Sequence, residues 1–465
     1  MNMRNLLTPM TRNPISLVGT ALMLISAILF ASLLAIELLG GAGNPYTGII
    51  TYLILPAVGA FGFILVLFGI RRERKRAPGA PFPVVDLNVD SVRNRLVLFV
   101  ILVSLGAVVL AAATYEGFHL MESESFCGET CHSVMGPELV AYQRSPHARV
   151  ACVECHIGSG TKWMVKMKLN GAWQMISTIL DLYDRPIPTP VHNLRPSRGT
   201  CEECHWPEKF YGVNAKLITH YSPDAANTEL KTILLMKTGG NDFSGSHGIH
   251  WHMDPEIQIR YRADEKRQTM FEVELTEADG TIKTYLKQNI KDTAGEPEDW
   301  RIMDCIDCHN RPTHQFFRAD EAVDLALKRN FIAQDLPFIR REGEKALRAE
   351  YETQEAAKEG IAAHTAQFYK REFPQLASTR SEDILEAGRV LGAFYTNNVY
   401  PDMNIEWGSY PDHSGHHFSP GCNRCHAGDH EAENGEIISA DCSVCHTIVA
   451  WEEASPEILE LIPRD

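Results

Sequence analysis

Residues 126–157 read FCGETCHSVMGPELVAYQRSPHARVACVECHI and contain two cysteine pairs, each followed directly by a histidine. The second pair, Cys152 and Cys155 before His156, has the spacing C-x-x-C-H, which is the attachment signature of haem c. In this signature both thiols add to the haem vinyl groups, and the adjacent imidazole becomes the proximal iron ligand. The stretch therefore predicts a fold organised around covalently bound haem.

The same signature recurs along the whole chain. All twelve cysteines fall into six close pairs, and a histidine follows each pair. The further regular motifs are Cys201/Cys204-His205, Cys305/Cys308-His309, Cys422/Cys425-His426 and Cys442/Cys445-His446. The first motif, Cys127/Cys131-His132, has three spacer residues instead of two, and a disulfide is its competing interpretation.

Other sites that use a C-x-x-C pair are zinc centres, thioredoxin-type redox pairs and disulfides. None of these requires a histidine at the next position, so we predict six covalently bound c-type haems. No cysteine remains for a thiolate nucleophile or an all-cysteine metal cluster. Because haem c is attached in an oxidising compartment, the chain beyond about residue 115 should lie outside the cytoplasm.

Three apolar runs near the N-terminus are each long enough to cross a membrane. They are Ile15–Ile36, Gly48–Ile70 and Leu96–Thr114. We expect the first run to be an uncleaved helix, because no small-residue cleavage site follows it.

Basic residues orient these runs. The segment before the first run and the link between the second and third runs carry them: Arg4, Arg12, Arg71, Arg72, Arg74, Lys75, Arg76, Arg93 and Arg95. The link between the first two runs has no lysine or arginine, so the positive-inside rule predicts a cytoplasmic N-terminus and an external haem region in an inner membrane.

Thirteen histidines lie outside the motifs, which is enough to give every iron a second imidazole ligand. Bis-histidine ligation gives low-spin irons suited to electron transfer. The distal ligands that we expect from local context are His147, His314, His416, His430 and one of His250 or His252. Met135, three residues after His132, is interpreted as a thioether ligand of the first haem or as a packing residue.

We expect a mostly α fold with little regular structure. Three transmembrane helices (1–114) precede a haem-packed cytochrome domain: haems one to three (115–210), a small β insertion (211–300), haem four with a helical segment (301–404), and a two-haem C-terminal segment (405–465). Alternating residues predict strands at Gln258–Arg262, Thr269–Glu274 and Thr281–Lys287, with a turn at Asp279-Gly280.

The net charge of −15 shows no excess of basic residues of the kind that binds nucleic acid. The acidic surface is read as ordinary solvation or as a docking face for a basic partner.

The order of these features resembles the NapC/NirT family of membrane-anchored quinol dehydrogenases. An apolar run leads into Phe126-Cys127, followed by Met135, Ser-Pro-His147 and the second motif; the motif Cys305-Ile-Asp-Cys308-His309 comes later, with His314 behind it. With its extra apolar runs and motifs, the chain is similar to the larger inner-membrane cytochromes of metal-reducing bacteria.

The resemblance implies ligands as well as a function. It implies Met135 on the first haem, His314 on the second and His147 on the fourth. It implies oxidation of menaquinol from the menaquinone pool at the periplasmic face, with electrons passing to a periplasmic multihaem cytochrome or reductase in anaerobic or extracellular respiration. The chain departs from the smaller members, which have four haems, one helix and two spacer residues in the first motif.

The family places a lysine and a carboxylate at its quinol pocket, after the second motif. The candidates at that place in this chain are Lys166, Lys168, Gln174 and Asp181, and Gln174 stands near the position expected for the acid. The segment Lys162–Leu182 is amphipathic and suits a helix at the membrane surface, although a helix packed on haems is the alternative.

Two other functions remain open at this stage. One is a terminal multihaem reductase of a small nitrogen or sulfur oxyanion, which would need an open iron coordination site. The other is a pure electron-transfer subunit of a larger membrane complex, with quinol chemistry performed elsewhere.

Overall fold

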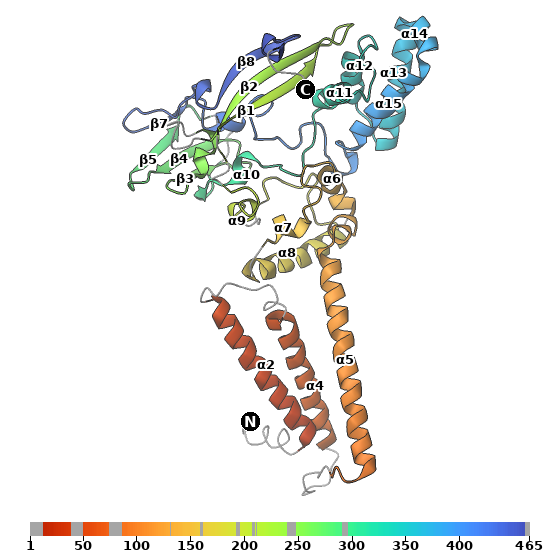
Figure 1. Ribbon diagram of the computed structural model, residues 1–465, viewed down its shortest axis with the longest axis vertical. Coiled ribbons are helices and arrows are strands. Elements are labelled where there is room, and N and C mark those ends of the chain that lie inside the picture. The colour runs from red at the N-terminus through yellow and green to blue at the C-terminus, as the bar shows by residue number, and fades with distance from the viewer. Residues whose placement is uncertain are drawn as a thin grey trace. The chain divides into compact units, whose positions relative to one another are not determined.

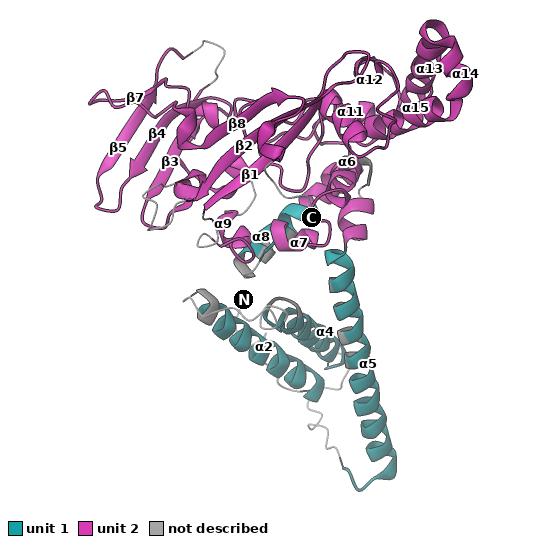
Figure 2. Ribbon diagram, turned by 45° about the horizontal axis from the view of Figure 1, so that its top comes forward, with its two compact units in different colours: residues 1–123, 157–172 teal, residues 124–156, 173–465 magenta. Residues whose placement is uncertain are grey.

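The structure is a computed structural model. It describes residues 13–38, 50–73, 86–130, 132–158, 161–191, 196–206, 210, 212–239, 248–290 and 296–460. The chain divides into two compact units, one comprising residues 1–123 and 157–172, the other comprising 124–156 and 173–465 (Figures 1 and 2). Arg4, Arg12, Arg74, Lys75, Arg76 and Cys131 lie outside the described residues.

In the first unit, helices α2 (Pro14–Leu38) and α4 (Leu55–Glu73) pack through small residues. A Cβ atom added to Gly19 would lie 2.6 Å from the Gly62 carbonyl oxygen, and one added to Gly62 would lie 2.7 Å from that of Gly19. The Ser26 hydroxyl donates to the Leu55 carbonyl. Small residues and interhelical hydroxyl bonds are typical of helices that associate in a membrane, where no hydrophobic effect drives them together.

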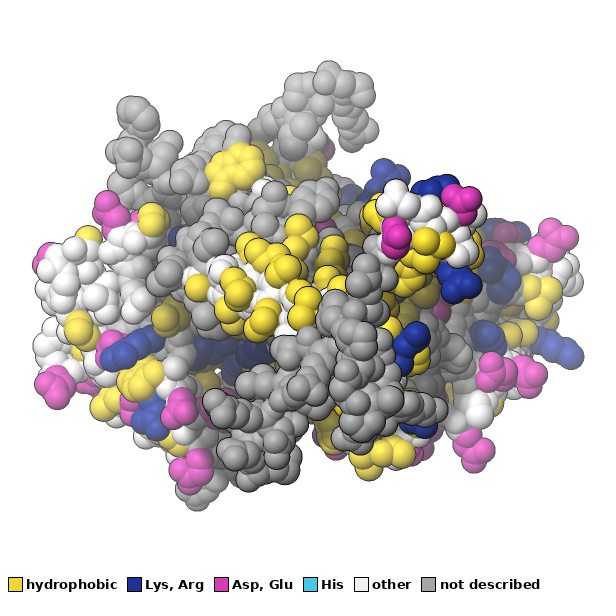
Figure 3. Space-filling view, turned by 90° about the horizontal axis from the view of Figure 1, so that it is seen from below, with side chains coloured by type: hydrophobic (Ala, Val, Ile, Leu, Met, Phe, Trp, Pro, Cys, Tyr) yellow, Lys and Arg dark blue, Asp and Glu magenta, His cyan; other side chains and the backbone are white. Residues whose placement is uncertain are grey.

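Two helices of the described residues are long and apolar enough to span a membrane, Pro14–Ala35 and Leu55–Glu73. The third expected span, Leu96–Thr114, is not one of these two. The third apolar run forms part of α5 (Asp90–Glu122), a helix of 33 residues whose large apolar side chains from Leu96 to Val109 are mostly exposed. The helix α5 continues beyond the apolar run at both ends, and these end segments contain charged residues. Figure 3 shows many apolar side chains at the surface of the molecule.

The second unit begins with short helices that carry the first three motifs. They are η2 (Ser125–Glu129), α6 (His132–Gln143), α7 (Cys152–His156) and α9 (Arg198–Cys201), and the longer α8 (Thr161–Ile179) lies between the last two in sequence. Turns without regular structure join them.

Two antiparallel sheets follow. The first has the strand order β1-β2-β8, with β1 at Gly212–Tyr221, β2 at Glu229–Gly239 and β8 at His446–Glu453. The second has the order β6-β3-β4-β5-β7, with strands Arg301–Ile302, Gln258–Ala263, Met270–Thr276, Ile282–Lys287 and His430–Ala432.

The predicted strands β3, β4 and β5 are confirmed, and Asp279 accepts a hydrogen bond from the Thr281 amide in the predicted turn. The sheets nevertheless extend beyond the expected insertion. Strands β7 and β8 come from the C-terminal segment and pair with β5 and β2. The chain is therefore mixed helix and sheet rather than mostly α.

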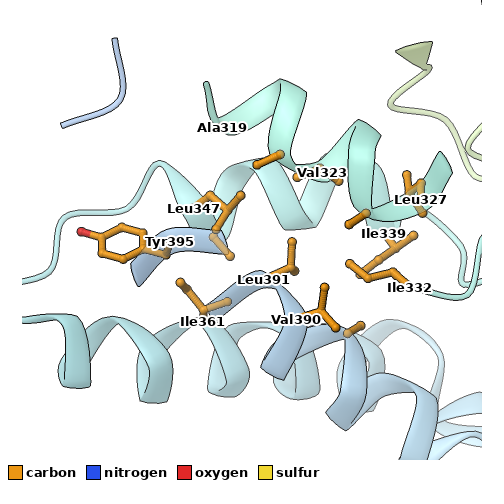
Figure 4. Packing of buried hydrophobic residues seen from close by; sticks show 14 of the residues in the cluster. Ala319, Val323, Leu327, Ile332, Ile339, Leu347, Ile361, Val390, Leu391 and Tyr395 are labelled. Carbon is orange, nitrogen blue, oxygen red and sulfur yellow. The ribbon is translucent and has the colours of Figure 1, made fainter. Parts of the chain in front are cut away.

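A helical cluster with its own apolar core completes the second unit, as expected for this part of the sequence. Its helices are α11 (Ala319–Lys328), α12 (Ile339–Leu347), α13 (Gln354–Glu372), α14 (Pro374–Thr379) and α15 (Ser381–Thr396). The Thr353 hydroxyl caps α13 by accepting from the Ala356 amide. Leu327, Ile339, Leu347, Ile361 and Leu391 are fully buried at the centre (Figure 4).

Candidate haem-binding sites

The regular motifs lie on single helical turns. Backbone bonds from His205 to Cys201, from His309 to Cys305 and from His426 to Cys422 close these turns, with N···O distances of 2.7, 2.8 and 3.0 Å. One turn brings residues three apart onto the same side of the backbone. Both thiols can therefore reach one porphyrin edge while the following imidazole turns toward the iron. The ten cysteines of the five regular motifs are free thiols in the structure.

The polypeptide leaves three of the predicted attachment cysteines exposed: Cys155, Cys204 and Cys442. Cys204 also lies beyond the end of α9 at Cys201, in a looser turn in which its amide donates to the Cys201 carbonyl at 3.1 Å. The other cysteines of the regular motifs are partly buried. A thiol that reacts with a haem vinyl group must be accessible from outside the chain, so the exposure of these three thiols is consistent with haem attachment. Their role as attachment residues stays a prediction.

The fourth motif is held in place by buried carboxylates. Asp304 caps the helix α10 (Cys305–Cys308) and accepts from the Ser197 amide at 2.6 Å, which ties the motif to the helix of the third motif. Asp307, between the two cysteines, accepts from the Tyr261 hydroxyl at 2.6 Å. Burial, together with the Asp307 charge, raises the pKa of Tyr261 well above its ordinary value, so the hydroxyl stays a donor.

Each motif histidine of the five regular motifs faces a second histidine from elsewhere in the second unit. Five ring-centroid distances fall between 5.8 and 6.3 Å. The pairs are His156–His314 (6.2 Å), His205–His147 (6.0 Å), His309–His250 (6.3 Å), His426–His252 (5.8 Å) and His446–His416 (6.0 Å).

These distances fit an iron between the two rings. An imidazole nitrogen binds a metal at about 2 Å and lies roughly 1.1 Å from its ring centre, so two trans imidazoles should have centroids about 6 Å apart. Aromatic rings in direct contact have centroids about 4.5–7 Å apart, so this spacing is compatible with an iron between the rings without being specific to one. The spacing therefore fits bis-histidine haem c at all five regular motifs.

Hydrogen bonds orient the distal rings. The Nδ1 atoms of His250 and His252 lie 2.7 Å from the carbonyl oxygens of Thr238 and Ile249, and Nδ1 of His314 lies 3.0 Å from that of Glu138. A proton on Nδ1 donated to a carbonyl leaves Nε2 unprotonated and free to bind a metal. The backbone thus selects the tautomer that an iron ligand needs.

Neighbouring motifs are also close in space. Thiols of consecutive motifs lie within range of hydrogen bonding or electrostatic interaction at every step from the first motif to the sixth. The neighbouring thiols are Cys127–Cys152, Cys155–Cys201, Cys155–Cys204, Cys201–Cys305, Cys308–Cys422 and Cys422–Cys445. The six motifs therefore form one continuous series that follows the order of the sequence.

The ring pairs differ from the expected ligand assignments in three ways. His147 faces His205 of the third motif, not His309 of the fourth. Both His250 and His252 face a motif histidine, where one was expected. The loop that carries both is a turn of 3-10 helix, Ile249–Met253, on which the two side chains diverge.

The third difference is His430, the expected ligand that the structure brings to no motif. Its side chain is fully buried, with Nδ1 2.9 Å from Asp429 Oδ1 and Nε2 2.9 Å from the Met270 carbonyl oxygen. Both ring nitrogens are therefore engaged by the protein. Proximity in sequence to His426 favoured His430, whereas the sheet register fixes it as the first residue of β7.

At the first motif the structure describes the backbone of His132 but not its side chain. Met135 is partly buried and packs against an apolar cluster of Val134, Met403, Ile405 and Tyr410. This contact is compatible with packing and does not decide between the two interpretations of Met135.

The candidate quinol residues lie on or just after α8. Lys166 Nζ lies 4.9 Å from the Trp163 ring centroid, Gln174 is exposed, and the side chain of Lys168 is outside the described atoms. Asp181 forms an ion pair with Arg185 at 2.5 Å. This hydrogen-bonded guanidinium holds the pKa of Asp181 below its usual range, which makes the carboxylate a weak proton acceptor.

Comparisons with known proteins identify the family of the chain. Residues 90–187 match the N-terminal region of the NapC/NirT cytochrome c family. The chain is 39% identical to the cytochrome c-type protein ImcH of Geobacter sulfurreducens over 456 residues, covering 96% of this chain and 90% of that protein. It is 30% identical to the cytochrome c-type protein NrfH of Wolinella succinogenes over 118 residues, covering 24% of this chain and 64% of that protein. No solved structure matches the chain. The chain therefore belongs to the NapC/NirT family of c-type cytochromes, the membrane-anchored multihaem proteins of electron transport.

Proposed function

We propose that this protein oxidises menaquinol at the periplasmic face of the inner membrane and transfers the electrons through six c-type haems to a periplasmic multihaem cytochrome or reductase. The unbroken series of neighbouring motifs carries this proposal, because an electron conduit needs consecutive carriers at short range. Haem c supplies reversible one-electron chemistry at each site. The protein holds the sites in order and sets the ligands of each iron.

The histidine pairs favour transfer over terminal reduction. A reductase of a small nitrogen or sulfur oxyanion needs at least one iron with an open position for the substrate. At all five regular motifs a second imidazole lies opposite the proximal one. Only the first motif, with its longer spacer, lacks a described partner ring.

For the first haem we propose Met135 as the distal ligand. The side chain lies on α6, one turn after His132, and is already part of the interior. Thioether ligation raises the reduction potential relative to imidazole. A higher potential at the first site would help it accept electrons from a quinol.

For the quinol site we propose the surface of α8. Leu169, Trp173 and Ile176 recur at helical spacing and are exposed by 69%, 59% and 47%. Ile179, at the end of the helix, is exposed by 77%. Such a stripe suits a helix lying in the membrane interface, where quinol arrives from the bilayer. Lys166, Lys168 and Gln174 on the same helix are the candidate polar contacts.

We propose that α5 is the third membrane span and that the N-terminus is cytoplasmic. The exposed apolar side chains of residues 96–109 would otherwise face water. The basic residues that flank the apolar runs support this orientation. Residues 1–114 then form the anchor, and the haem domain is periplasmic.

The test is direct reduction of the purified, oxidised full-length protein in detergent by a menaquinol analogue, followed through the haem absorption bands. We expect haem reduction, with dithionite giving the end point of full reduction. If dithionite reduces all haems but the quinol reduces none, quinol oxidation is excluded and the chain is an electron-transfer subunit served by another protein.

A further inference from the structure

A sixth histidine pair has the same ring spacing as the five haem pairs but contains no motif histidine. His220 and His417 have ring centroids 6.0 Å apart and an angle of 24° between the rings. The His309–His250 and His446–His416 pairs are nearly identical in form, at 6.3 Å and 10° and at 6.0 Å and 21°. No cysteine precedes either His220 or His417 at the motif spacing.

The environment of His220 also resembles that of a metal ligand. Its Nδ1 faces the Asp324 carboxylate at 3.4 Å, and Asp324 is itself buried and accepts from Arg340 Nε at 3.1 Å. A carboxylate that takes the Nδ1 proton leaves Nε2 free for a metal and increases the basicity of the ring. The Asp324 carboxylate can accept the Nδ1 proton of His220, as backbone carbonyls can accept that of His250 and His252.

A bare metal ion does not suit this pair. Among the residues that the structure describes, no group of three or more histidine, cysteine, aspartate or glutamate side chains could hold a metal ion. A protein site for zinc or a similar ion normally supplies at least three ligands. Two trans imidazoles are sufficient only where the other four donors come with the metal, as they do in haem.

The place in the fold is adjacent to the sixth motif. His417 follows His416 directly, and His416 faces the motif histidine His446. His220 and His446 lie on the same face of the first sheet. Met236 of β2 pairs with Asn214 of β1 and with His446 of β8, so these three side chains share one face. Every second residue of β1 from Asn214 to His220 points to that face as well.

Apolar side chains share this face with Asn214 and Lys216 between the two histidines. Ile218 stands two residues before His220, and Leu234 pairs with Ile448, which is 48% exposed. An exposed aliphatic surface beside a pair of separated imidazoles is what a porphyrin face packs against.

We infer that His220 and His417 are the axial ligands of a seventh haem, bound without thioether bonds beyond the sixth motif. All twelve cysteines belong to the six motifs, so this haem is held only by its two iron–nitrogen bonds and by packing. It is therefore extractable, unlike the six covalent haems. The inference extends the proposed conduit by one site, and its failure would leave the six-haem proposal intact.

The experiment uses the full-length protein purified in detergent. Total haem per chain is measured as the pyridine haemochrome, and haem that acid–acetone extracts is measured separately; bound copper and zinc are determined by elemental analysis. We expect one extractable haem per chain in addition to six that remain attached. His220→Ala and His417→Ala should each lose the extractable haem and retain the six.

His364→Ala is the matched control, because His364 is a half-buried histidine of the same unit that bonds Glu342 and faces no second imidazole among the described residues. It should keep the extractable haem. The inference is overturned if no haem is extracted from protein that carries six covalent haems, if one copper or zinc ion is bound instead, or if both histidine variants keep the extractable haem. Six attached haems in each variant show that the chain has folded and matured.

Discussion

In the proposed haem sites, each distal histidine would use one ring nitrogen for a hydrogen bond to the protein and the other for the iron. His314 has Nδ1 3.0 Å from the Glu138 carbonyl oxygen and its ring 6.2 Å from that of His156, whereas both ring nitrogens of His430 are bonded to protein. Two histidines that lie equally close to a motif in sequence therefore have different chemistry. The difference depends on hydrogen bonds that only the folded chain contains.

Replacing His314 by methionine should raise the reduction potential of the second haem by on the order of 0.1 V, because a thioether stabilises the reduced iron more than an imidazole does. Redox titration followed by absorbance measures this shift. His430→Gln is the control and should leave all potentials unchanged. A shift in the control with none in His314→Met would reverse the assignment of the two residues.

Met135→Ala tests the ligand of the first haem. If Met135 binds the iron, its loss leaves that iron five-coordinate or water-bound, and the oxidised protein gains a high-spin signal in its electron paramagnetic resonance spectrum. The potential of one haem should also fall. Met135→Leu keeps the packing against Val134 and Tyr410 and separates loss of ligation from loss of volume. Unchanged spectra in both variants would reject Met135 as ligand.

His413 makes stability sensitive to acid. Burial, with the nearby Arg424 charge, lowers the pKa of His413 from 6.5 to about 4. Between these values the unfolded chain binds a proton that the folded chain does not, so stability falls as the pH drops from 6.5 to 4, by about 3 kcal/mol in all. Thermal unfolding at pH 7.5 and pH 5 measures the effect. His413→Gln should show a smaller difference in Tm between the two pH values; an equal difference would exclude His413.

At the scale of elements, the membrane hairpin of α2 and α4 depends on two glycines in contact. Gly62→Ala would place its Cβ atom 2.7 Å from the Gly19 carbonyl oxygen, which forces the helices apart. We expect a loss of about 1–3 kcal/mol in the packing of this hairpin. Gly106→Ala on α5 is the control, because nothing lies within 4 Å of its added Cβ. Limited proteolysis in detergent should cleave the first variant faster and the second at the normal rate. Equal rates would contradict the close packing of α2 on α4.

Local pattern predicted some elements and could not predict others. Strands β3, β4 and β5 were predicted because they alternate regularly and are joined by short turns. Strand β8 has exposed apolar residues at successive positions, Ile448 and Val449, and it pairs with β2 across more than 200 residues of sequence. Such pairing joins segments far apart in the sequence, and no local window of sequence contains that information.

At the scale of the whole molecule, the predicted attachment residues follow from local sequence, whereas the histidine that faces each motif depends on the fold. Each proximal histidine follows its cysteines directly, so local spacing identifies it. The partner of His426 is His252, and the partner of His156 is His314, both from segments distant in sequence. Local context selected His147, His314 and His416 as ligands, but the motif that each one faces depends on the folded path of the chain.

The series of motifs also sets the order in which the proposed haems can exchange electrons. Because consecutive motifs are neighbours, the first lies at the membrane end of the sequence and the sixth at the far end of the series. A periplasmic partner would therefore dock near β8 and the sixth motif.

The intact mass of the mature protein under denaturing conditions tests the six-haem conduit most directly. Covalent haems remain attached under these conditions, and any non-covalent haem is lost. The mass should exceed that of the 52.0 kDa polypeptide by six haem groups, after allowance for any processing of the N-terminus. A mass that corresponds to fewer than six haems would contradict the six-haem series, and a mass without haem would contradict the conduit as a whole.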